Sequence, residues 1–426
     1  MRVFVTGATG FIGTELVKEL IEAGHEVRGL TRSDAGVEQL KAMGAEVHRG
    51  NLTDLDSLRR GATGMDVVVN LAFSHDDMSQ FARNAKDEIQ AIEALGSVMK
   101  PGNLLVVTSG IGITNGAPGQ VRKENDPPAD SPAMPRRPEQ AAQAVAAKGV
   151  HVGIVRLPQV HDTRKQGLVT WLIQIAREKG LSAYVGDGAN RWAAAPLKDV
   201  AHLYRLAVEK TGPGVTTYHA VQEEGVSLRD IAEMIGKGLK VPVVSIPAEK
   251  AGEHFGIFFG HAVTQDMPAA SEWTRKTLGW DPAGPGLIED LANMKFADTR
   301  TIIKQAYSAF NKRDIDAALA LMTQDVSWPK ASEGGRVVGR EAIRDYWTRQ
   351  WSEFDPHVEP LAMTEEGGGK TRVRVHQLVK SLQGDVLSDS EVLHVFTVKS
   401  GLIAAMDLGD EADPTAGPSA AFAYRS

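Results

Sequence analysis

A glycine-rich turn near the start of the chain constrains the fold most. Residues 6–13 read Thr-Gly-Ala-Thr-Gly-Phe-Ile-Gly, after a short apolar strand at 3–5 and before a helical pattern of apolar residues at 16–21. Gly7 suits the tight turn, Gly10 leaves room for a pyrophosphate, and Gly13 lets a helix pack closely on a strand. The turn is either purely structural or, as we expect, a dinucleotide site at a helix N-terminus. The expected contacts here are Gly7, Thr9, Gly10, Phe11, Ile12 and Gly13.

Strands and helices alternate behind this turn. Apolar strands are expected at 3–5, 27–30, 46–48, 66–71, 103–108 and 151–156, with helices near 37–43, 54–60 and 78–96. Such alternation is typical of a parallel sheet covered by helices on both faces. The sequence therefore predicts an α/β Rossmann domain with a doubly wound parallel sheet and a small substrate region. Ligands bind such sheets beyond the carboxyl ends of the strands.

The residues after the second and third strands bear on the nucleotide. Arg32, between two hydroxyl residues, stands where an acidic residue would bind the ribose of NAD, and it suits a 2′-phosphate. We therefore expect NADP, with NAD as the alternative; otherwise Arg32 is a solvated surface charge. Asn51 can face the adenine beside Leu52, and Asp54 can cap the next helix. The other expected cofactor contacts are Leu71, Ala72, Phe73, Thr108, Leu157 and Pro158.

These segments resemble the extended short-chain dehydrogenase/reductases, including the NAD-dependent epimerase and 3β-hydroxysteroid dehydrogenase groups. The likeness covers about residues 1–296 and rests on the segments 6–13, 70–72, 108–109, 156–160 and 278–282. It implies a Rossmann half followed by a smaller substrate region. We place this first domain at 1–297.

The chain departs from that family in its acid/base pair. Members pair a tyrosine with a lysine four residues later, but no tyrosine here has a lysine at that spacing. The segment 135–139 holds Arg136 and Arg137 instead, with Glu139 at the lysine position. Three interpretations stay open: another group carries the proton, an arginine polarises the carbonyl as a fixed charge, or the domain binds NADP without turnover. The proton-carrying candidates are His75, His161 and a water held by Ser109.

A second pattern begins at Thr299. Helices are expected at 302–310, 314–322 and 343–351, and strands at 371–380, 389–398 and 402–408, which predicts an α+β cone. The segments 309–314, 325–328, 339–343 and 401–403 resemble the nuclear transport factor 2-like, or SnoaL-like, superfamily. We place this domain at 299–411, followed by a flexible tail at 412–426.

That superfamily includes isomerases, cyclases, epoxide hydrolases and dehydratases, and also proteins that only bind ligands or dimerise. A histidine and an aspartate in an apolar cone can move a proton next to a carbonyl. The pattern leaves open whether His376 faces the pocket, because Arg372 and Arg374 share its strand face. The candidate catalytic residues are His376 and Asp407, with His394 as a further polar group, and the expected walls are Trp328, Tyr346, Trp347 and Trp351.

Composition and net charge narrow the range of possible partners and sites further. The 426 residues need more than one core, and a net charge of −7 makes nucleic acid and anionic membranes poor partners. The chain has no cysteine, and its histidines show no metal-ligand spacing, so we expect no metal site. Met1 adjoins the first strand, so we expect no signal peptide and a cytoplasmic location. The expected partners are a small-molecule substrate and, by resemblance, a second copy in a homodimer.

Together these features predict an NADP-dependent oxidoreductase of an atypical short-chain class acting on an apolar carbonyl or hydroxyl compound. One alternative is an isomerase, cyclase or dehydratase carried by the cone, with a structural NADP domain. Another is a non-catalytic protein that senses NADP.

Overall fold

The computed structural model describes residues 1–74, 80–114, 117, 119–129, 135–294, 296, 299–330, 333–366, 370–399 and 401–409. His75 and the tail expected at 412–426 lie outside these residues. The contacts divide the chain into two compact units. The first unit comprises Met1–Thr170, Tyr184–Met234 and Ser245–Met294, and the second comprises Trp171–Ala183, Ile235–Val244 and the described residues after 294.

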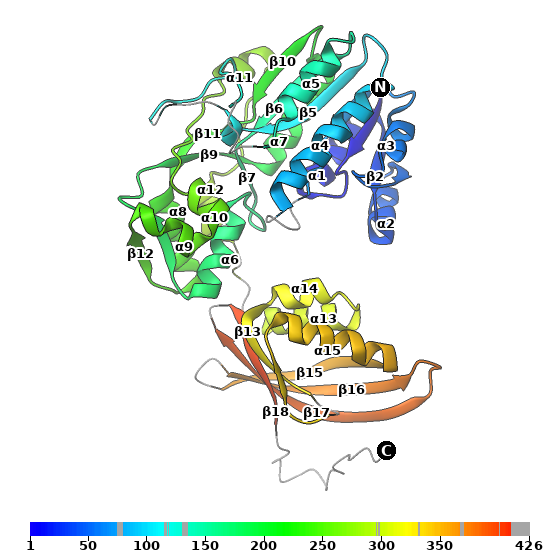
Figure 1. Cartoon of the computed structure of the whole chain (residues 1–426), viewed down its shortest axis with the longest axis vertical. Helices are drawn as coiled ribbons and strands as arrows, with labels where there is room; N and C mark the ends of the chain where they lie inside the picture. The colour runs from blue at the N-terminus through cyan, green and yellow to red at the C-terminus, as the bar shows by residue number, and fades with distance from the viewer. Residues whose placement is uncertain are drawn as a thin grey trace. The chain divides into compact units, whose positions relative to one another are not determined.

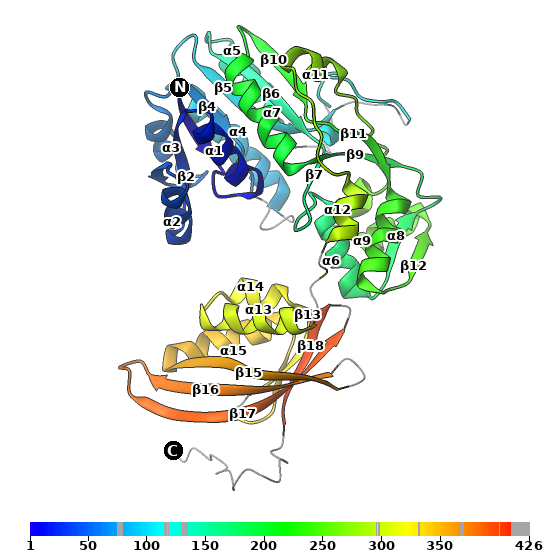
Figure 2. The same cartoon turned by 180° about the vertical axis from the view of Figure 1, so that it is seen from behind.

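The strands are shown in Figures 1 and 2. They are β1 (Arg2–Thr6), β2 (Glu26–Thr31), β3 (Glu46–Arg49), β4 (Val67–Asn70), β5 (Leu104–Gly110), β6 (His151–Leu157), β7 (Gln159–His161), β8 (Ser182–Val185), β9 (Arg191–Pro196), β10 (Val215–His219), β11 (Glu223–Ser227), β12 (Val243–Ile246), β13 (Met322–Pro329), β14 (Arg336–Val338), β15 (Phe354–Glu366), β16 (Lys370–Ser381), β17 (Val386–Lys399) and β18 (Leu402–Leu408).

The helices follow the same order. They are α1 (Phe11–Glu22), α2 (Asp34–Ala42), α3 (Leu55–Ala62), α4 (Phe81–Gly96), α5 (Pro138–Ala146), α6 (Val169–Lys179), α7 (Leu197–Lys210), α8 (Leu228–Leu239), α9 (Ala251–Phe255), α10 (Ile257–Ala262), α11 (Glu272–Leu278), α12 (Leu287–Asn293), α13 (Thr299–Asn311), α14 (Ile315–Ala320) and α15 (Arg340–Glu353), with short 3-10 turns η2 (Ile111–Ile113) and η3 (Ala248–Lys250).

A seven-stranded sheet forms the first unit's centre, in the order β10-β6-β5-β4-β1-β2-β3. All its pairings are parallel. The chain order reverses at β1, which lies between β2 and β4, so the predicted doubly wound α/β sheet is confirmed. A ligand crevice is expected beyond the carboxyl ends of the strands at this switch point.

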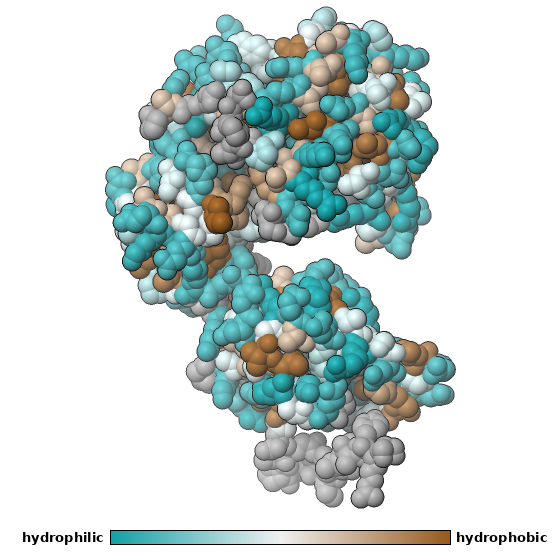
Figure 3. All heavy atoms as spheres, viewed as in Figure 1, coloured by the Kyte–Doolittle hydropathy of each residue, from teal (hydrophilic) through white to brown (hydrophobic). Residues whose placement is uncertain are grey.

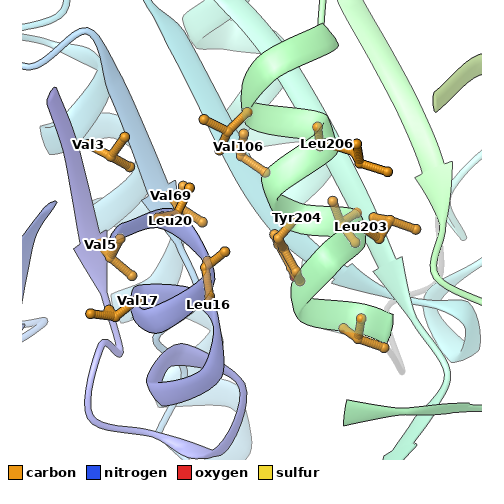
Figure 4. Close-up of a cluster of buried hydrophobic side chains, with 14 of the residues drawn as sticks. Val3, Val5, Leu16, Val17, Leu20, Val69, Val106, Leu203, Tyr204 and Leu206 are labelled. Atoms are coloured by element: carbon orange, nitrogen blue, oxygen red, sulfur yellow. The ribbon is translucent and has the colours of Figure 1, made fainter. Parts of the chain in front are cut away.

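Two apolar layers hold this sheet. Figure 4 shows the layer in which Leu16 of α1 and Leu203 of α7 face Val5, Val69 and their neighbours on the strands. The other face carries α3, α4 and α5, whose apolar stripes pack on the opposite side chains of β4 and β5. Each fully buried valine or leucine contributes about 1.5–3 kcal/mol, so the two layers fix the strand ends that form the crevice.

The second unit contains the cone. Its six-stranded sheet has the order β14-β13-β18-β17-β16-β15, and α13, α14 and α15 cover one face. Along β16, Val373 and Val375 are buried in the core, while Arg372 and Arg374 are exposed. The face that carries Arg372 and Arg374 is therefore polar. Figure 3 shows hydrophobic residues both over the middle of the cone and near the β16–β17 hairpin, where Leu382 is 58% exposed.

No helix in the described part of the chain combines the length and apolar character that crossing a bilayer requires.

Candidate functional site

The glycine turn forms a cradle that side chains would fill. Gly7 has φ of +67°, and a Cβ placed there would lie 3.1 Å from the backbone nitrogen of Ala72. A Cβ at Gly13 would lie only 2.0 Å from the carbonyl oxygen of Gly7. Glycine is therefore required at both positions for α1 to pack against the end of β1.

The N-terminus of α1 opens into this cradle. Its N-cap is Gly10, whose side chain cannot satisfy the first N–H groups, and the first turn contains no acidic residue. Those N–H groups and the helix dipole favour a phosphate there. Thr6 supports the turn, because its hydroxyl donates to Asn70 Oδ1 at 2.7 Å and accepts from Ala72 N at 3.3 Å. The residues present thus fit a dinucleotide pyrophosphate.

The ends of β2 and β3 form the next part of the edge. Arg32 follows β2 and is exposed. Ser33 caps α2, since its hydroxyl accepts from Gly36 N at 3.1 Å. Arg49 ends β3 beside Thr31 and is ion-paired with Asp34 in the first turn of α2. Two arginines therefore stand with one aspartate near the adenosine end of the predicted site.

Asn51 organises the turn after β3. Its Oδ1 accepts hydrogen bonds from Thr53 N at 2.9 Å, Thr53 Oγ1 at 2.8 Å and Asp54 N at 3.0 Å. Asp54 in turn caps α3 by accepting from Ser57 N at 2.9 Å, so the predicted cap is confirmed. Leu52 packs against the core below.

The other expected cofactor residues lie at the neighbouring strand ends. Leu71, Ala72 and Phe73 directly follow β4, and all are half-buried. Thr108 lies on β5, where its hydroxyl is 2.7 Å from the hydroxyl of Tyr204 on α7. Burial strongly raises the pKa of Tyr204, so this tyrosine stays protonated as a structural partner. Leu157 ends β6, and Pro158 follows it, also half-buried.

Ser109 belongs to a buried polar network and not to an open surface. Its hydroxyl donates to Glu139 Oε1 at 2.7 Å, and Arg156 donates to both oxygens of that carboxylate at 2.9 and 2.8 Å. His219 approaches Arg156 at 3.4 Å, and burial lowers the pKa of this histidine. Ser109 and Glu139 are 1% and 2% exposed. The structure therefore places Ser109 where its hydroxyl positions α5 rather than holding a water.

Arg136 is held at the ends of β4 and β5. Its Nε and Nη2 donate to the two carboxylate oxygens of Glu88 at 2.8 and 2.6 Å, and Nη2 lies 3.4 Å from the carbonyl oxygen of Thr108. The guanidinium stacks 4.4 Å over the Phe73 ring. Burial raises the pKa of Glu88, and Arg136 counteracts this effect. Arg136 is thus a fixed cation and not a solvated loop charge.

Glu88 was missed at the sequence level, although a signal existed. It stands on the buried stripe of α4 with Ala85, Ala91 and Ile92. A carboxylate at such a position needs a partner, because an isolated buried charge is costly. Only the fold shows that this partner is Arg136, 48 residues away.

His161 ends β7 and forms a buried pair with an aspartate. Its Nδ1 lies 2.7 Å from Asp290 Oδ2 on α12, and the imidazole is fully buried. Its Nε2 is buried without a hydrogen-bond partner among the described residues. The pair has the arrangement that holds an imidazole in one tautomer, but Asp290 could not be found from sequence spacing.

The cone places its predicted polar residues on different faces. His376 pairs with Asp389 at 2.6 Å, and its side chain is 37% exposed on the outer face with Arg372. Asp407 pairs with Arg336 at 2.7 Å and is also partly exposed. His376 and Asp407 are therefore not the inward-facing pair that the sequence hypothesis required.

His394 faces the cone interior instead. The Tyr307 hydroxyl on α13 lies 2.8 Å from His394 Nδ1, and both side chains are buried. Burial lowers the pKa of His394 to about 4 and strongly raises that of Tyr307, so both groups are neutral at neutral pH. Phe396 contacts both rings, and Trp328 and Trp347 extend the aromatic cluster from Phe396.

Within the described residues, no cluster of three or more histidine and acidic side chains could hold a metal ion.

The fold and the glycine cradle together define an NAD(P)-binding Rossmann protein. Comparison with known proteins agrees: residues 7–182 match the NAD(P)H-binding family model, and residues 303–406 match the SnoaL-like domain model.

Curated relatives support the first domain along its length. An uncharacterised protein of Saccharomyces cerevisiae is 43% identical over 68% of this chain and 98% of its own length. An uncharacterised protein of Schizosaccharomyces pombe is 40% identical over 69% of this chain and 99% of its own length. A Stigmatella aurantiaca 4-hydroxy-2-methyl-3-oxo-4-farnesyl-3,4-dihydroquinoline-1-oxide ketoreductase is 26% identical over 60% and 80%.

Solved structures share the fold. MoeE5 in complex with UDP-glucose and NAD has a TM-score of 0.54 at 23% identity, covering 69% of this chain and 97% of that one. The human epimerase family protein SDR39U1 with NADPH has a TM-score of 0.53 at 19% identity, covering 69% and 99%. The chain belongs to the same family as the two yeast proteins, and it carries a SnoaL-like domain after its NAD(P)H-binding domain. The resemblance inferred from the sequence is confirmed.

Proposed function

We propose that the protein is an NADP-dependent reductase of small apolar carbonyl compounds, or the dehydrogenase of the corresponding alcohols. The observation that carries this proposal is the glycine cradle, in which a Cβ at Gly7 or Gly13 would meet backbone atoms. Such close backbone approach suits a pyrophosphate at the N-terminus of α1. A bound reduced nicotinamide would supply a hydride to a carbonyl carbon.

The preference for NADP rests on charge at the adenosine end. Arg32 directly follows β2, and Arg49 at the end of β3 adds a second arginine, which is paired with Asp34. An arginine can bind a 2′-phosphate with several donors, whereas NAD offers only a ribose hydroxyl there. The relative that is a ketoreductase supports carbonyl chemistry.

Calorimetric titration with NADPH, NADH and their oxidised forms tests the cofactor proposal. We expect micromolar binding with a preference for the phosphorylated nucleotides. Gly13→Ala should weaken binding by at least about tenfold, because its Cβ would displace the turn. Gly212→Ala is the matched control, since nothing lies within 4 Å of the added Cβ. Absence of binding by the wild-type protein would refute the proposal.

The cone supports a second candidate function. Its inward pair, Tyr307 and His394, lies among aromatic side chains and is neutral at neutral pH. Such a pair can hold a ligand oxygen or move a proton beside a carbonyl. Loss of product in a Tyr307→Phe variant that still oxidises NADPH would favour this candidate. Unchanged product formation would refute it.

A further inference from the structure

The site contains a fixed cation where the family's usual tyrosine and lysine are missing. Arg136 uses two of its nitrogens on Glu88, which is 1% exposed, so the guanidinium cannot swing away without leaving a buried carboxylate unpaired. Its side chain is 14% exposed and therefore still reaches the protein surface, at the strand ends where the ligand crevice is expected. The remaining nitrogen, Nη1, has no hydrogen-bond partner within the described part of the chain.

The position of Arg136 is set by two strand ends. Its guanidinium stacks on Phe73, which follows β4, and approaches the carbonyl of Thr108 on β5. These strands lie on the side of the switch point opposite β2 and β3. Because Arg32 marks the adenosine end, the β4 and β5 ends belong to the nicotinamide end of the crevice.

An aromatic surface extends from the same point. Phe73 lies 5.8 Å from Phe81 at the start of α4, and Phe81 lies 5.3 Å from Phe258 on α10, measured between ring centroids. All three rings are half-buried. Beside them, Ile257 is 92% exposed. These side chains favour an apolar or aromatic ligand over a sugar, which needs several hydrogen-bond partners.

The charge of Arg136 is already balanced by Glu88. An ion pair with no net charge attracts a carboxylate or phosphate weakly, but its free N–H can still donate to a neutral carbonyl oxygen. The site therefore selects a ketone over an organic acid.

Two other candidates for the carbonyl oxygen are less suitable. The Ser109 hydroxyl is committed to Glu139 and is 1% exposed. His161 is fully buried and bound to Asp290. Neither presents a donor at the surface of the crevice.

We propose that Arg136 is the catalytic residue that binds the carbonyl oxygen of an apolar aromatic ketone through Nη1, between the ends of β4 and β5. This inference rests on the proposed reductase function. As the carbonyl carbon accepts a hydride from a reduced nicotinamide, its C=O π pair moves onto oxygen, and the Nη1–H stabilises that oxygen until water protonates it. No titrating tyrosine is needed, because arginine stays charged.

The first test uses 1-phenylbutane-1,3-dione, an apolar aromatic diketone whose enolate has its own ultraviolet absorbance. A pH titration of the protein-bound probe, without nucleotide, gives the pKa of its enol. A hydrogen bond donated to the enolate oxygen favours the charged form and so lowers this pKa. We expect the Glu88→Gln/Arg136→Gln variant to raise the bound probe's pKa by at least about one unit relative to wild type. Removing both charges avoids leaving Glu88 unpaired.

Two variants sharpen this test. Arg137→Gln changes the adjacent arginine and should leave the bound probe's pKa unchanged. Arg136→Lys keeps the positive charge but lacks the planar guanidinium that binds Glu88 through two nitrogens. The pKa of the bound probe should therefore lie between its values in the wild-type protein and in the double variant. An unchanged pKa in the double variant, or no binding of the probe by the wild-type protein, would overturn the assignment of Arg136.

A second test measures NADPH oxidation with the same diketone. Loss of one donor to a developing oxyanion costs about 10²–10³ in kcat, so we expect a fall of this size in the double variant, with NADPH affinity unchanged. Equal kcat in both proteins would overturn the inference. Failure of the wild-type protein to bind NADPH would instead refute the reductase proposal, while the enol titration would still decide the role of Arg136 in ligand binding.

Discussion

The hydroxyl of Ser109 donates a 2.7 Å hydrogen bond to Glu139 Oε1, which joins the end of β5 to the first turn of α5. Arg156 on β6 completes this buried unit. The segment just before α5 carries Arg136, so the network fixes the place from which that arginine reaches the crevice. Glu139, which stands at the position of the family's lysine, thus has a structural role: its negative charge holds Arg156.

Replacing Glu139 should therefore affect stability far more than replacing Ser109. Glu139→Ala leaves Arg156 as a buried unpaired cation and should lower the free energy of unfolding by about 3–5 kcal/mol. Ser109→Ala removes one hydrogen bond and should cost about 1 kcal/mol. Urea denaturation measures both, with Glu233→Ala on the exposed face of α8 as a control near zero. Equal losses of stability in Glu139→Ala and Ser109→Ala would contradict the central role of Glu139 in the network.

Arg32→Glu should weaken NADPH binding much more than NADH binding. A hydrogen bond to a charged group contributes about 1.5–3 kcal/mol, so loss of the 2′-phosphate contact predicts an effect of about 10–100-fold. Calorimetry with both nucleotides measures the difference. Arg60→Glu on α3, also exposed, makes the same charge change elsewhere and should alter both affinities little. If Arg32→Glu weakened the binding of NADPH and NADH equally, the assignment of Arg32 to the 2′-phosphate would be wrong.

Local patterns predicted most of the first domain. The glycine turn needs only its own neighbours, because a Cβ at Gly13 would collide within the same turn. The strands β1, β4, β5 and β6 are largely buried and apolar, so their composition allowed them to be predicted. β10 was missed, since Val-Thr-Thr-Tyr-His follows a Gly-Pro-Gly segment and carries little apolar character.

The cone shows the limits of the same reasoning. β15 was missed because Pro356 and Pro360 interrupt its pattern, and proline is tolerated there only because β15 is an edge strand. Sequence alternation also could not say which face of β16 points inward. The helices α13–α15 decide this by covering the face that carries Val373 and Val375. Which of the two histidines, His394 or His376, faces the interior of the cone therefore depends on tertiary packing.

The stability of the cone should fall in mild acid because of His394. Burial lowers the pKa of this imidazole to about 4, compared with about 6.5 in an unfolded chain. Between these values only the unfolded chain binds the proton, so the stabilising contribution is complete above pH 6.5 and is lost as pH falls toward 4. The linkage predicts a loss of about 2 kcal/mol between pH 7 and pH 5.

Urea denaturation at pH 7 and pH 5, followed by tryptophan fluorescence, measures this contribution. His394→Gln should remove about 2 kcal/mol of the pH dependence. His376→Gln is the matched control, because that imidazole is partly exposed on the outer face. An unchanged pH dependence in His394→Gln would show that other groups cause the acid sensitivity.

The pair of His161 and Asp290 can be dissected with two replacements of the aspartate. Asp290→Leu removes the acceptor for His161 Nδ1, so both ring nitrogens would be buried without partners, and we expect a loss of about 1–3 kcal/mol in the free energy of unfolding. Asp290→Asn keeps an amide oxygen that can accept from Nδ1–H, so it should lose less than half as much. Urea denaturation of both variants at pH 7 measures the difference. If Asp290→Asn is as damaging as Asp290→Leu, the negative charge itself matters and His161 must be a cation in the folded protein. The smaller loss would instead show a neutral imidazole with Nε2 as an acceptor, because Asp290 then fixes the tautomer through the hydrogen bond alone.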